Sequence, residues 1–149
     1  MNVRMLAVLA LSVALLISAC STASSAVSGA ASPPAASTGA TTRTSDGGQV
    51  TVVADWAGPA YGAVFDVKLD THSVDLDALD LSNAVLRNDR GETLTAQRWA
   101  APKGGHHREG SLTFEGDAPS FFAGARWIEI VLSGVGDLPE RTIRWELGA

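Results

Sequence analysis

The chain has 149 residues, a formal net charge of −5 at pH 7 and one cysteine. A single cysteine excludes an intramolecular disulfide, so a folded domain of this sequence must be held together by its core. The acidic balance also argues against a nucleic-acid partner, because binding to phosphates needs a basic patch.

The first nineteen residues have the pattern of a secretory signal peptide. Arg4 gives the N-terminus a positive charge, and residues 6–17 form an apolar stretch. This stretch is too short to span a hydrocarbon core, which needs about 20 residues. It ends in the sequence LISAC (residues 16–20), which resembles the lipobox of bacterial lipoproteins. The resemblance implies cleavage before Cys20 and its acylation. An ordinary signal with an incidental cysteine is the alternative.

Cys20 is therefore predicted to anchor the exported chain to the cell membrane or the outer membrane, facing the periplasm or the cell exterior. Residues 20–47 consist almost entirely of Ser, Ala, Thr, Gly and Pro. Such a segment cannot bury enough apolar surface to offset the entropy lost on ordering, so it is predicted to be a disordered tether. As a flexible coil it has a root-mean-square span on the order of 30 Å.

Residues 48–149 are predicted to form one all-β domain, an antiparallel immunoglobulin-like sandwich of about seven strands. The alternation of apolar and polar residues is clearest in 63–70, where Phe65, Val67 and Leu69 share a face. Turn-forming residues separate this strand from others expected at 49–56, 83–88, 93–99, 110–115, 127–132 and 142–147. Residues 74–81 are compatible with one short helical turn. The cysteine pair of true immunoglobulin domains is absent, so only the architecture is predicted.

All three histidines of the chain are predicted to meet at one end of this sandwich. In immunoglobulin topology the second and fifth strands are antiparallel neighbours, so the end of one lies beside the start of the other. His72 follows the second strand, and His106 and His107 precede the fifth. Asp70 and Asp75 fall close by. One missed strand between the two would place these loops at opposite ends.

The histidines allow two interpretations. Imidazole is a ligand for Zn(II) and Cu(II), and a carboxylate can complete the set, so His72, His106, His107 and Asp70 are candidate metal ligands. Alternatively, the histidines hydrogen-bond to loop carbonyls and hold two loops together. The spacing matches no established metal motif, and the neighbours His106 and His107 point to opposite sides in a regular strand.

Trp99 is out of phase with Leu94 and lies near the same end. It is a candidate for stacking on a sugar, and the alternative is that it packs beneath a loop. The blocks DTHSVDL (70–76), Trp99, GGHH (104–107) and GSLTF (110–114) resemble, in the same order, an uncharacterised family of exported bacterial and archaeal β-sandwich domains. This resemblance implies the fold and brings no catalytic roles.

No nucleophile motif of the G-x-S-x-G kind is present, so catalysis is not expected. The sequence therefore predicts a cell-envelope lipoprotein whose domain is a non-enzymatic binding module. A divalent transition metal, an envelope protein and a glycan are the candidate ligands. Membrane contact is assigned to the acylated Cys20, because the domain has a net charge of −6, with 15 acidic and 9 basic residues.

Overall fold

The computed structural model describes residues 41–148. The predicted signal peptide, Cys20 and most of the predicted tether lie outside the described residues. The strands are β1 (Thr41–Ser45), β2 (Val50–Trp56), β3 (Val64–Thr71), β4 (Val85–Asn88), β5 (Thr93–Ala100), β6 (His107–Glu115), β7 (Trp127–Val135) and β8 (Leu138–Glu146). A 3-10 helix, η1 (Pro59–Tyr61), and a short α-helix, α1 (Ala118–Phe122), complete the elements.

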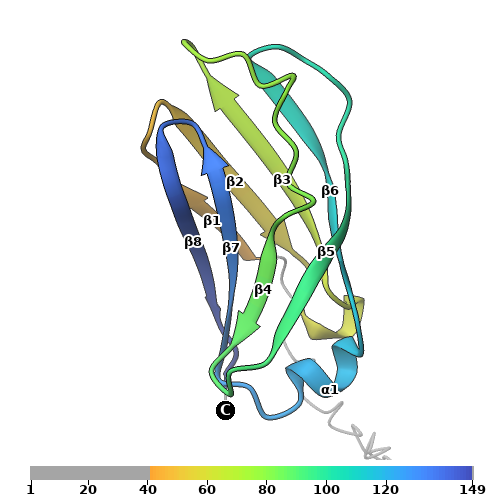
Figure 1. Ribbon diagram of the computed structural model, residues 1–149. Coiled ribbons are helices and arrows are strands. Elements are labelled where there is room, and N and C mark those ends of the chain that lie inside the picture. Colours follow the sequence, from red (N-terminus) through yellow and green to blue (C-terminus); the bar gives the residue numbers. More distant parts are fainter. Residues whose placement is uncertain (1–40, 149) are drawn as a thin grey trace, which may run out of the picture. The chain divides into compact units, whose positions relative to one another are not determined.

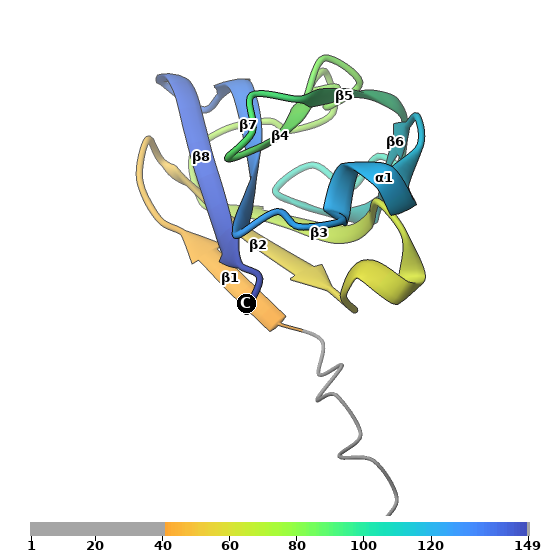
Figure 2. The same cartoon turned by 90° about the horizontal axis from the view of Figure 1, so that it is seen from below.

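The strands are all antiparallel and form one sheet in the order β1-β2-β3-β6-β5-β4-β7-β8 (Figure 1). The predicted all-β antiparallel fold is confirmed. The order β2-β3-β6-β5 followed by β4-β7-β8 is that of the two sheets of an immunoglobulin-like sandwich. Here pairing between β4 and β5 joins the two sheets into one. Viewed along the strands, the sheet curls around the core until β1 and β8 lie close to each other (Figure 2).

Strand β1 is an eighth strand that the sequence analysis does not predict, and it corrects the boundary of the tether. Residues 41–47 were expected to be disordered, but β1 pairs along its length with β2. Its side chains are exposed or partly exposed on both faces, so no apolar alternation marks it. Side chains of β8 close the seam. Trp145 Nε1 donates to the Thr41 carbonyl at 2.8 Å, and Arg141 Nη1 donates to the Ser45 carbonyl at 3.0 Å.

The core lies between the two halves of the curled sheet. Phe65 is fully buried on β3, and its ring centroid lies 5.6 Å from that of Trp56 and 5.1 Å from that of Trp145. Burying a large apolar side chain contributes roughly 1.5–3 kcal/mol, so this aromatic cluster is a major part of the folding energy. Residues 74–81, which are compatible with one helical turn, contain no helix but do form a single turn in which the Leu79 N–H donates to the Leu76 carbonyl at 3.0 Å. The connection from β3 to β4 is instead a loop held by the buried Leu76 and Leu81.

Two short elements cover the end at which β3 begins. Helix α1 and η1 contact each other there (Figure 1). The Asp117 carboxylate caps α1 by accepting a hydrogen bond from the Ser120 N–H at 3.3 Å. No helix within residues 41–148 is long and apolar enough to cross a membrane.

Candidate functional site

The end of β3 and the start of β6 lie side by side, as the predicted chain direction requires. Asp70 faces His107 in the β3–β6 ladder. Just beyond it, the Thr71 N–H donates to the His106 carbonyl at 3.0 Å. We call this end the histidine pole, made of residues 70–79 and 101–108. The predicted convergence of the two loops is confirmed.

A tight turn brings the two adjacent histidines into place. The His107 N–H donates to the Gly104 carbonyl at 3.2 Å, and Gly105 has a φ of +63°, in the left-handed region that favours glycine. A Cβ atom on Gly104 would lie 2.1 Å from the His107 carbonyl oxygen. The Asp77 carboxylate accepts the N–H groups of both glycines at 2.9 Å. These bonds hold the pKa of Asp77 below its ordinary range and fix the turn.

Each of the paired histidines has an intramolecular partner. His106 Nδ1 lies 2.8 Å from the Val74 carbonyl, which accepts its hydrogen bond. His107 Nδ1 lies 2.6 Å from Asp70 Oδ1, although the His107 side chain remains 69% exposed. His72 is exposed and has no hydrogen-bond partner within residues 41–148. The pole thus contains all the predicted ligands, and two of its histidines tie β6 to the preceding loop and strand.

These contacts also define what the rings can do chemically. Because the Val74 carbonyl can only accept, His106 Nδ1 carries the hydrogen of this contact. The Nε2 atoms of His106 and His107 have no hydrogen-bond partner within residues 41–148, while Asp70 holds Nδ1 of His107. A ring oriented by an oxygen at one nitrogen is typical of metal-ligating histidine. In the part of the chain that the structure describes, however, no group of three or more His, Cys, Asp or Glu residues is placed to hold a metal ion.

Arg108 is the residue at this pole that sequence reasoning missed. It is buried, with 7% of its surface exposed, and its guanidinium donates to four carbonyls of two loops. The acceptors are Pro102 at 3.0 Å, Leu76 at 2.7 Å, Leu79 at 2.5 Å and Ala101 at 3.0 Å. Arg108 therefore joins both loops of the pole. The alternation of β6 could have revealed it, because Arg108 falls on the same face as the buried Leu112 and Phe114.

Trp99 faces inward because β5 contains an irregularity. The register with β6 shifts between Ala96 and Arg98, which puts Trp99 on the inner face despite its spacing from Leu94. The ring packs against the core, and the Arg108 guanidinium lies 4.2 Å from its centroid. The structure thus places Trp99 beneath a cation that covers one ring face. Sugar stacking on Trp99 stays a prediction.

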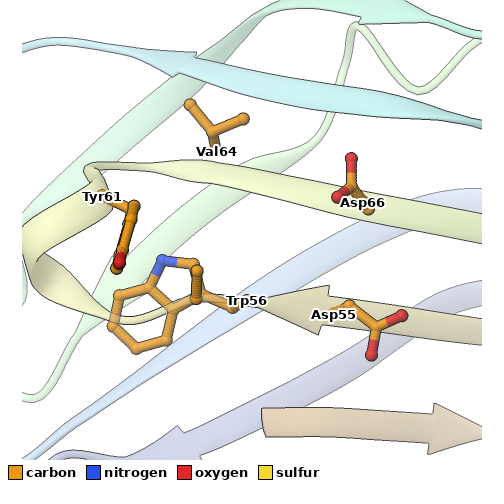
Figure 3. A pocket seen from close by; sticks show the side chains of 6 residues that line it. Asp55, Trp56, Tyr61, Val64 and Asp66 are labelled. Carbon is orange, nitrogen blue, oxygen red and sulfur yellow. The ribbon is translucent and has the colours of Figure 1, made fainter. Parts of the chain in front are cut away.

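A second candidate site lies at the opposite end of β3. A hollow of about 330 Å³ is lined by Asp55, Trp56, Ala57, Tyr61, Val64 and Asp66 (Figure 3). We call it the Tyr61 hollow. Tyr61 is 64% exposed and Val64 is 41% exposed, and they are the exposed large hydrophobic residues of the described chain. Sequence reasoning missed this site because its lining comes from β2, η1 and β3 together.

Comparison of the chain with protein families, with curated proteins and with solved structures found no match. The resemblance of residues 70–114 to exported sandwich domains stays a prediction. Any function must therefore be argued from the residues of the two sites.

Proposed function

We propose that the protein is an exported lipoprotein, anchored through Cys20, whose sandwich is a non-enzymatic module that binds another protein of the cell envelope. The observation that carries this proposal is the Tyr61 hollow. Single exposed hydrophobic residues are ordinary on protein surfaces, but here Tyr61 and Val64 line one hollow together. Exposed apolar surface that is gathered in one place marks interaction sites.

The experiment has an anchoring arm and a binding arm. Cys20→Ala should move the protein from the membrane fraction to the soluble fraction of cells that export it. For binding, a photo-cross-linking amino acid replaces Val64 in the hollow or Glu140 on the exposed face of β8. A discrete adduct with an envelope protein is expected from position 64 and not from position 140. Equal yields of adduct from both positions, or no adduct from either, would contradict the proposal that the domain is a binding module.

The histidine pole has a structural role in this proposal. His106 Nδ1 bonds to the Val74 carbonyl, and this contact links the start of β6 to the loop after β3. His106→Ala should lower the melting temperature when no metal is present, because the Val74 carbonyl loses its donor. His72→Ala is the matched control, since His72 is exposed at the same pole and is expected to leave the melting temperature unchanged.

Binding of Zn(II) or Cu(II) is the second candidate function, favoured by the Nε2 atoms of His106 and His107, which have no hydrogen-bond partner among the described residues. The exposed His107, oriented by Asp70, is the strongest ligand, and His72 is its candidate partner. Calorimetric titration of the full chain with Zn(II) tests this. Saturable heat that disappears in His107→Ala supports metal binding. A binding heat of the wild type no greater than that of the His72→Ala/His107→Ala double variant would contradict metal binding.

A further inference from the structure

We infer that the Tyr61 hollow receives a lysine or arginine side chain of the partner protein. This inference rests on the proposed function and names the chemistry of the partner. It is carried by three features of the described residues: two aspartates paired in register without a positive counterpart, an exposed aromatic ring that lines the same hollow, and an apolar wall.

The two aspartates occupy opposite positions on neighbouring strands. Asp55 on β2 is directly opposite Asp66 on β3 in the ladder, and both line the hollow. Side chains directly opposite in an antiparallel pair have Cβ atoms about 4.5–5.5 Å apart, and like charges there are destabilising. Repulsion between the two aspartates lowers the stability of the unbound protein, and a bound cation would relieve it.

Neither carboxylate is neutralised by a cation within residues 41–148. Asp66 is exposed and forms no hydrogen bond or ion pair there, and Asp55 accepts only the hydroxyl of Thr42. The cation on the same face of β3 is Lys68, two residues beyond Asp66, and it lies 3.5 Å from Glu109 instead. The negative charge at the hollow is therefore available to an external cation.

The rest of the lining suits a long cationic side chain better than a small ion. The exposed ring of Tyr61 can attract an ammonium or guanidinium group lying within about 6 Å of its face. Val64 and Ala57 provide an apolar surface for the methylene stem, as long charged side chains often use. Calcium, by contrast, needs 6–8 oxygen ligands, more than two aspartates supply.

The test is a titration of the full chain in detergent with a blocked peptide of alternating glycine and lysine. The same peptide with acetylated lysines is the neutral control. We expect saturable binding of the lysine peptide that weakens as salt rises, and none of the acetylated peptide. Asp55→Asn/Asp66→Asn should weaken binding at least about tenfold, and Tyr61→Ala about threefold. Glu140→Gln, which removes one charge on β8, should leave binding unchanged.

A second measurement guards against a variant that fails to fold. The melting temperature of Asp55→Asn/Asp66→Asn should equal or exceed that of the wild type, because the substitution removes a like-charge contact and keeps an acceptor for Thr42. Loss of binding without loss of stability then assigns the carboxylates to recognition. A lower melting temperature would contradict the inference, because the pair would then be stabilising the fold.

Several results would overturn the inference. One is that the wild type and Asp55→Asn/Asp66→Asn bind the lysine peptide with equal affinity. Another is that the wild type binds 1,5-diaminopentane as tightly as it binds the peptide. The third is that Ca²⁺ saturates the site and displaces the peptide. If the peptide fails to bind while the adduct at position 64 persists, the inference fails and the proposed function stands. If the peptide binds and no adduct forms, the proposed function fails and the hollow remains a site for cationic side chains.

Discussion

Replacing Arg108 by methionine should remove a large part of the stability of this domain. The guanidinium donates to four loop carbonyls and lies over the Trp99 ring. Methionine fills similar space but donates nothing, so the four carbonyls lose their donor. At about 1 kcal/mol for each of the four carbonyls and about 0.5–1 kcal/mol for the contact with Trp99, the loss is about 4.5–5 kcal/mol. Whole domains have only about 5–15 kcal/mol.

Urea unfolding of the full chain, followed by tryptophan fluorescence, measures this loss. The midpoint should fall for Arg108→Met while the slope with denaturant stays the same. Arg108→Lys should lie in between, because lysine keeps the charge but not the planar fork that reaches four acceptors. Arg98→Met on β5 is the matched control, since Arg98 is exposed. A loss below about 1 kcal/mol for Arg108→Met would refute the reasoning, because its hydrogen bonds would then be replaced by water at no cost.

Three further predictions concern stability. Asp77→Asn should lower the melting temperature at neutral pH, and its difference from the wild type should shrink as the pH falls through the acid range. The two backbone N–H groups that Asp77 accepts hold its pKa down, so its contribution is present above the unfolded-state pKa and is lost as pH falls through the folded-state value. Thermal melts across this range check it. Gly110→Ala should cost about 1–3 kcal/mol in urea unfolding, because its Cβ would lie 2.2 Å from the Ala100 carbonyl, whereas Gly148→Ala meets nothing and should be neutral. Glu129→Ala should cost about 1–2 kcal/mol, because this buried carboxylate pairs with Arg87 and Arg144. The loss stays this small because both arginines are half-exposed and water can solvate them in the variant. A free energy of unfolding in urea equal to that of the wild type would contradict this prediction.

The sequence predicts most of the sheet because most strands alternate strictly. Residues 63–70 and 142–147 each bury every second side chain, and they correspond to β3 and β8. Immunoglobulin topology then predicts which strands are neighbours, and β3 indeed pairs with β6. The convergence of the histidine loops follows from strand direction alone. Coarse pattern and chain direction thus suffice for the order of β2 to β8 and for one pole.

The elements that the sequence analysis missed lack such a pattern for physical reasons. Strand β1 is polar on both faces, and its hydrogen bonds to β2 do not depend on its side chains. Helix α1 has five residues, too few to display a 3.6-residue period. The irregularity in β5 reverses the phase after Ala96, so Trp99 could not be assigned to a face from alternation. In each case the backbone geometry leaves no trace in the alternation of apolar and polar residues.

The two sites on β3 differ in how completely their polar groups are satisfied from within. At the histidine pole, Val74 accepts from His106, Asp70 pairs with His107, and Asp77 accepts two backbone N–H groups. At the Tyr61 hollow, Asp66 has no such partner among the residues that the structure describes. A polar group already bonded inside the fold gains little from a ligand, because an old bond is exchanged for a new one. An exposed carboxylate without a partner in the fold exchanges only water for a bound cation, and relief of the repulsion by its neighbouring carboxylate adds to the gain. Binding is therefore expected at the start of β3, and rigidity at its end.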